Sequence, residues 1–184
     1  MLDPREGFLM TRRDERRFVE FVVAHQGRLR RAAFLITGDW TSADDVTQEA
    51  LVRLYVALPR LDHVESLLGY ARRTVVNVAI DAARKRGTRE RYESQEPVPH
   101  PLPDVAGAHA ERTMIMAALG SLAPRQRAVV VLRYFEDLSV EQTAQVMGCS
   151  HGTVKSQTAR GLDTLRRSLV EAGWHHEVEL EVSE

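Results

Sequence analysis

Side chains able to carry acid–base or metal chemistry are scattered along this chain. The seven histidines and the single cysteine, Cys149, follow no catalytic spacing, and the sequence contains no HExxH motif, glycine-rich phosphate loop or nucleophile elbow. One cysteine forms neither an internal disulfide nor a cysteine-based zinc site. The sequence therefore indicates a protein that is not an enzyme and that needs no cofactor and no metal.

Basic side chains gather in one stretch, although the formal net charge of the chain is only -1. Between Tyr70 and Arg91, seven Lys and Arg residues are opposed by two acids, whereas the end of the chain is acidic. Nucleic-acid binding depends on how charge is distributed rather than on the total. The distribution predicts separate faces for separate partners.

The elements that must position these charges are helical. From Arg13 to Arg86 the periodicity predicts three or four helices and no strand, with breaks at Gly38-Asp39 and around Pro59 to Asp62. Four prolines in residues 93–107 remove amide donors and disfavour helix, which predicts a linker. Helical periodicity then runs from about Glu111 to Ala172.

The expected fold is all-α, with two small helical domains joined by a Pro-rich flexible linker. The expected boundaries are an N-terminal extension at 1–12, a first domain at 13–92, a linker at 93–110, a second domain at 111–172 and an acidic tail at 173–184. No apolar run approaches the roughly 20 residues that span a bilayer, and the first residues lack a signal-peptide pattern. We therefore expect a cytoplasmic protein without membrane insertion.

One predicted helix of the first domain has two distinct faces. Apolar residues three and four positions apart form a stripe that should be buried, at Leu68, Ala71, Val75, Val78 and Ala82. Arg73, Asn77 and Asp81 recur every four residues on another face, which Arg84 and Lys85 continue. This second face is suited to nucleic acid.

The second domain contains a helix-turn-helix pattern. Ser139 and Gln142 have the spacing of a capping box, and Gly148 permits a tight turn before Ser150, which can cap a second helix. On that helix Lys155 and Arg160 have the charge and the length to reach a major groove. This pattern alone leaves several readings open: a structural helix pair with a solvated basic face, a repressor, an activator or a sigma factor.

Four segments of the second domain resemble region four of sigma factors: Leu122–Arg127, Val129–Tyr134, Phe135–Ser139 and Gly152–Ser156. In that family the domain reads the promoter element near position −35. The resemblance implies DNA contacts at Lys155, Ser156, Ala159 and Arg160.

Two segments of the first domain resemble region two of the same family. Asp44–Tyr55 is similar to the polymerase-binding helix, and Tyr70–Arg86 is similar to the end of the region. The resemblance implies that five residues face the clamp helices of the largest polymerase subunit: Asp44, Asp45, Gln48, Glu49 and Arg53. It also implies that the −10 element is captured near the loop Leu61–Leu67 by Arg73, Asn77, Asp81, Arg84 and Lys85.

Together these segments resemble the extracytoplasmic-function (ECF) sigma factors, in particular the actinobacterial sigma-E-like type. The resemblance implies an alternative sigma factor that binds core RNA polymerase and promoter DNA, with an anti-sigma protein as a further partner. An independent helix-turn-helix transcriptional regulator is the alternative. Such a regulator should bind double-stranded DNA without polymerase, whereas two tethered sigma domains gain their spacing on the polymerase surface.

Overall fold

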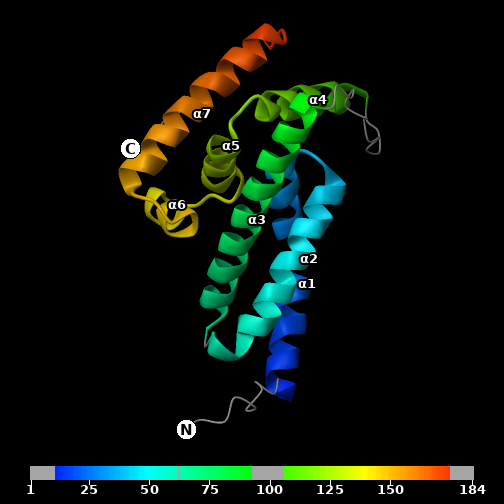
Figure 1. Cartoon of the computed structure of the whole chain (residues 1–184), viewed down its shortest axis with the longest axis vertical. Coiled ribbons are helices and arrows are strands. Elements are labelled where there is room, and N and C mark those ends of the chain that lie inside the picture. The colour runs from blue at the N-terminus through cyan, green and yellow to red at the C-terminus, as the bar shows by residue number, and fades with distance from the viewer. Residues whose placement is uncertain (1–10, 62, 93–105, 175–184) are drawn as a thin grey trace.

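The structure is a computed structural model that describes residues 11–61, 63–92 and 106–174 (Figure 1). Every regular element in these ranges is helical, as predicted. The first half contains α1 (Arg12–Thr37), α2 (Trp40–Ala57), the short 3-10 helix η1 (Leu58–Arg60) and α3 (Val64–Tyr92). The second half contains α4 (Ala106–Gly120), α5 (Pro124–Val130), the π-helical turn η2 (Val131–Phe135), α6 (Val140–Met147) and α7 (His151–Glu171).

The helices of the first half end where the sequence predicts breaks. Gly38 adopts φ 86°, a left-handed conformation that glycine tolerates, and its N–H donates to Phe34 O at 2.8 Å. Asp39 then caps α2, because its carboxylate accepts a 2.8 Å bond from Ser42 N–H. The helices α1, α2 and α3 therefore fold back on one another as an antiparallel bundle (Figure 1).

The interior of this bundle is apolar and closely packed. Ile36, Leu54 and Leu67 are almost completely buried. The stripe predicted on α3 faces this interior, since Ala71 and Val75 are buried and the other three members pack partly buried against the core. Other positions of α3, among them Asn77, Asp81 and Lys85, remain exposed.

The helix-turn-helix of the second half is confirmed. Ser139 N–H donates to Gln142 Oε1 at 2.9 Å and Gln142 N–H donates to Ser139 Oγ at 3.1 Å, which completes the capping box at the start of α6. Gly148 makes the turn with φ 60°, and Ser150 accepts a 3.1 Å bond from Thr153 N–H at the start of α7.

Two expected boundaries differ from the structure. The helix α3 already begins at Val64, so the expected loop Leu61–Leu67 is confined to the residues before it. The helix α4 begins at Ala106, within the expected linker 93–110; residues 93–105 of that linker lie outside the described residues, as do 1–10 and 175–184 of the two end segments. The chain is thus helical from Val64, where the resemblance implied a loop, and from Ala106, where the proline-rich composition suggested a linker.

The two halves pack against each other rather than lying apart. One continuous hydrophobic cluster includes Ile36 and Val76 of the first half and Val129, Leu132 and Val154 of the second. The helix α3 contacts both α5 and α6, and α1 contacts η2 (Figure 1). The expected tethered pair of domains is thus closed in this structure, because apolar and arginine side chains of each half are covered by the other.

Candidate polymerase and nucleic-acid interfaces

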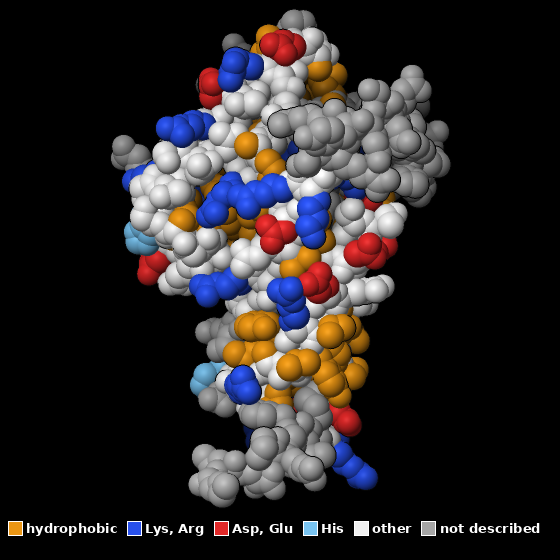
Figure 2. Space-filling model, viewed as in Figure 1, with side chains coloured by type: hydrophobic (Ala, Val, Ile, Leu, Met, Phe, Trp, Pro, Cys, Tyr) orange, Lys and Arg blue, Asp and Glu red, His pale blue; other side chains and the backbone are white. Residues whose placement is uncertain are grey.

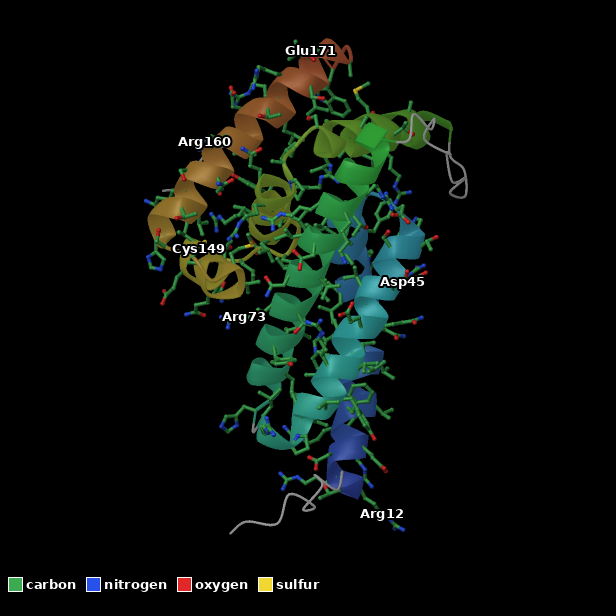
Figure 3. All side chains as sticks on the ribbon, viewed as in Figure 1. Arg12, Asp45, Arg73, Cys149, Arg160 and Glu171 are labelled. Atoms are coloured by element: carbon green, nitrogen blue, oxygen red, sulfur yellow. The ribbon has the colours of Figure 1, made fainter. Side chains whose placement is uncertain are left out.

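The helix α7 carries the residues expected at the −35 element. Val154 and Thr158 point inward and are buried, which turns the intervening positions outward. Lys155, Ser156, Ala159 and Arg160 are all exposed. Arg160 lies on the side of α7 away from the bundle (Figure 3).

The position of α7 is fixed by a close contact with α5. At Gly161 a Cβ atom would lie only 2.9 Å from Val130 Cγ2 and 3.5 Å from Leu122 Cδ2. A Cβ atom at this position would force α5 or α7 to shift, so Gly161 permits the close packing that sets the position of α7.

The helix α3 carries the residues expected at the −10 element. Arg73, Asn77, Asp81, Arg84 and Lys85 are all exposed. Arg84 lies 3.8 Å from Asp81 in a solvent-exposed ion pair, which contributes little to stability. Arg73 differs from its neighbours, because its Nη2 donates to the carbonyl oxygen of Gln145 on α6 and thus contacts the second half (Figure 3).

The helix α2 carries the residues expected at the polymerase. Asp45, Gln48, Glu49 and Arg53 are exposed, and Glu49 and Arg53 pair at 2.5 Å along the helix. The side chains of these four residues are therefore accessible to a binding partner.

Asp44 is turned toward α1 instead. Both nitrogens Nε and Nη2 of Arg30 donate to its carboxylate, the latter at 2.9 Å. Hydrogen bonding from Arg30 lowers the pKa of Asp44, and the same bond raises the pKa of Arg30. Arg30 is itself placed 4.4 Å above the ring of Trp40, which stacks on Phe34. The structure thus gives Asp44 a contact between α1 and α2.

A groove of about 320 Å³ runs between α2 and α3 and brings two of the expected sets together. One wall contains Asp45, Glu49 and Arg53, and the other contains Asn77, Asp81 and Lys85. A protein bound to α2 would therefore lie directly beside a DNA strand bound to α3.

Four exposed valines form an apolar patch that the sequence analysis missed. Val52 and Val56 of α2 are 64% and 71% exposed, and Val19 and Val23 of α1 are 58% and 77% exposed. Phe18 and Tyr55 contact edge to face, with ring centroids 5.1 Å apart, so α1 and α2 are packed together at this level. Figure 2 shows hydrophobic side chains gathered over the lower half of α2. Each pair has a four-residue spacing, which could have identified it on an outward helix face.

The described part of the chain holds no group of three or more His, Cys, Asp or Glu residues placed to bind a metal ion. Within the same residues, every helix is too short or too polar to cross a membrane.

The fold and these faces define an all-helical protein with a helical bundle in its first half and a helix-turn-helix in its second. Residues 21–89 match the family model described as Sigma-70 region 2, and residues 112–165 match Sigma-70, region 4. The chain is 39% identical over 153 residues to the RNA polymerase sigma-E factor of Streptomyces coelicolor, covering 83% of this chain and 86% of that protein. It is 33% identical over 159 residues to the ECF RNA polymerase sigma factor SigL of Mycobacterium tuberculosis, covering 81% and 86%.

The chain belongs to the ECF sigma factors. A solved structure of similar fold is the sigma factor RpoE of Bartonella quintana in complex with the anti-sigma factor NepR, with a TM-score of 0.68 and 21% identity over 84% of this chain and 98% of that one. Sigma factors bind core RNA polymerase and promoter DNA and catalyse no reaction. This chain is therefore an alternative sigma factor that directs promoter-specific transcription initiation through −10 and −35 elements, rather than an independent regulator.

Proposed function

We propose that this sigma activity is divided among three faces on two functional domains, 13–92 and 111–172. The outer face of α7 reads the −35 element with Lys155, Ser156, Ala159 and Arg160. The outer face of α3 holds the −10 element with Arg73, Asn77, Asp81, Arg84 and Lys85. The face of α2 binds the clamp helices of the largest polymerase subunit with Asp45, Gln48, Glu49 and Arg53, and with Asp44, whose side chain stays 43% exposed beside Arg30.

The observation that carries this assignment is the groove between α2 and α3. Its two walls come from the proposed polymerase face and the proposed −10 face. Single-stranded bases must be held once they are unstacked, and a polar groove beside basic side chains suits that task. Polymerase binding on α2 would place the melted strand against Asn77 and Lys85.

The valine patch extends the proposed polymerase face. On α2, Val52 and Val56 lie three and seven residues after Glu49 and therefore on the same side of the helix. A central apolar contact with a polar rim is the usual composition of a protein interface. In this proposal Asp45 and Glu49 orient the polymerase, and the valines supply the buried area.

The proposal includes an anti-sigma partner and a cytoplasmic location. The similar Bartonella structure is a complex with an anti-sigma factor, which supports the first of these. A cytoplasmic location follows from the need to reach polymerase and DNA.

The experiment that tests the proposal is transcription with purified chain, bacterial core RNA polymerase and genomic promoter fragments. We expect transcripts that start only when the chain is present and that share two upstream elements. Replacing Asp45 and Glu49 together by Ala should weaken association with core polymerase about ten-fold, as should Val52→Ser with Val56→Ser.

Glu171→Ala is the matched control, because Glu171 is an exposed acid at the far end of α7. Unchanged association in both double variants would refute the α2 assignment. DNA binding by the chain alone, without transcription, would instead support a regulator.

A further inference from the structure

Glu136 is a buried acid that joins the two halves of the molecule. It lies directly after η2, between α5 and α6, and its side chain is only 2% exposed. Arg28 of α1 donates from Nε to Glu136 Oε1 at 3.0 Å, and Arg72 of α3 donates from Nε to Oε2 at 2.9 Å. Arg28 Nη2 also donates to the carbonyl oxygen of Glu136 at 3.0 Å. Both carboxylate oxygens of this second-half residue are thus held by first-half arginines.

Two further arginine contacts cross the same boundary. Arg73 of α3 donates to the carbonyl oxygen of Gln145 on α6. In the opposite direction, Arg127 Nη1 of α5 donates to the carbonyl oxygen of Ile36 on α1 at 3.0 Å. Hydrogen bonds made by charged donors are stronger than neutral ones, so these contacts select one relative position of the halves.

Glu136 is more deeply buried than Arg28 or Arg72, so it depends most on the relative position of the two halves. A carboxylate so deeply buried is tolerated only while it is paired and hydrogen-bonded. Arg28 keeps 48% of its side chain exposed and remains hydrated in either arrangement. Removing the charge of Glu136 or of one arginine would leave a charged side chain without its partner at this buried boundary, so the intact pairs favour the closed arrangement over that of a variant.

The closed arrangement is too small to read two promoter elements at once. Elements named for positions −10 and −35 lie about 25 base pairs, or roughly 85 Å, apart along the duplex. A compact chain of this length has a radius of gyration of about 16 Å. Residues 93–105 could span at most about 45 Å, which allows two domains of ordinary size to reach both elements only after they separate.

We propose that Glu136, clamped by Arg28 and Arg72, is a latch that holds the free sigma factor closed and lowers its apparent affinity for polymerase and promoter until the halves separate. The latch rests on the proposed function in one respect, namely that the two halves read two separate elements. Closure also engages Arg73, which belongs to the proposed −10 face. The apparent affinity then falls in proportion to the open fraction.

The first test is small-angle X-ray scattering of the full chain with Glu136→Gln and with Arg28→Gln. Each variant removes one charge of the latch, from opposite halves of the molecule. We expect the radius of gyration to rise about 1.5-fold above the compact value of about 16 Å. Glu171→Gln makes the same charge change as Glu136→Gln, but at an exposed site far from the boundary between the halves. This control should leave the radius of gyration unchanged.

The second test is the concentration of each variant that gives half-maximal transcription with core polymerase. We expect a several-fold lower concentration for Glu136→Gln and Arg28→Gln than for the wild type. Far-UV circular dichroism identifies a variant that fails to fold, in which case the other variant, altered in the other half, decides.

An unchanged radius in a folded latch variant would overturn the proposal, as would an expanded variant that needs the wild-type concentration. If the wild type itself directs no transcription, the proposed function fails, while the scattering result still decides whether the latch exists.

Discussion

At the scale of single residues, Gly161 links helix packing to DNA recognition. The substitution Gly161→Ala would place a Cβ atom 2.9 Å from Val130 Cγ2, so either α5 or α7 must shift. We expect the free energy of unfolding to fall by about 1–3 kcal/mol, the usual effect of overpacking. Urea denaturation measures this change.

Gly152 provides the comparison for Gly161 on the same helix. The atom nearest to its added Cβ is Ser150 Oγ at 3.9 Å, an ordinary contact. Gly152→Ala should therefore be neutral or stabilising by up to about 1 kcal/mol. Equal destabilisation by the two substitutions would contradict the packing explanation.

Lys155 and Arg160 test the −35 assignment. If the residue contacts a base, replacing it by Ala should weaken binding of the polymerase holoenzyme to the −35 element by about 1–3 kcal/mol. If it contacts a phosphate, the substitution should reduce by about one the slope of the logarithm of the binding constant against the logarithm of the salt concentration. Association with core polymerase should not change. Fluorescence anisotropy with labelled promoter duplex at several salt concentrations measures both effects.

Arg166→Ala is the control for this pair, since Arg166 is exposed on the same helix but lies further from its N-terminus. Promoter binding that is equally weakened by all three substitutions would indicate general electrostatic attraction rather than a specific face.

At the scale of elements, the contact between Arg30 and Asp44 couples α1 to α2 in a pH-dependent way. The pKa of Asp44 is lowered in the folded chain, so this contact stabilises the fold above the ordinary carboxyl pKa of about 3.9. The contribution is lost as the pH falls through the lowered pKa. It is small, because both side chains are nearly half exposed.

We therefore expect Asp44→Asn to have a slightly lower melting temperature than the wild type at pH 7, and the difference to vanish in strong acid. Thermal unfolding between pH 2 and pH 7 measures it, and high salt should reduce the difference at pH 7. A difference that is constant over the whole pH range would contradict this account.

At the scale of the whole molecule, the continuous core and the arginine contacts predict cooperative unfolding of both halves. Arg127 contributes to this coupling, because it donates to Ile36 O in the first half and, at 2.7 Å, to Gly120 O at the end of α4. We expect one calorimetric transition for the wild type and two for Arg127→Ala. Two transitions in the wild type would refute this coupling, and one transition in a folded Arg127→Ala variant would show that the apolar core provides it without Arg127.

Local structure in this chain follows from short-range patterns. The capping box at Ser139 and Gln142, the turn at Gly148 and the break at Gly38-Asp39 were all predicted, because caps and left-handed turns are decided by neighbouring residues. The buried stripe of α3 followed from its periodicity. The boundaries at Val64 and Ala106 were less predictable, since helix ends depend on small free-energy differences.

The sequence by itself determined the helices, the helix-turn-helix and the order of the sigma regions, because each depends on residues close together in the chain. Only the tertiary structure placed Glu136 between Arg28 and Arg72, turned Asp44 toward Arg30 and left the valines of α1 and α2 exposed. These contacts join residues far apart in the sequence, and whether a charge is buried or an apolar side chain exposed depends on which surfaces meet when the helices pack.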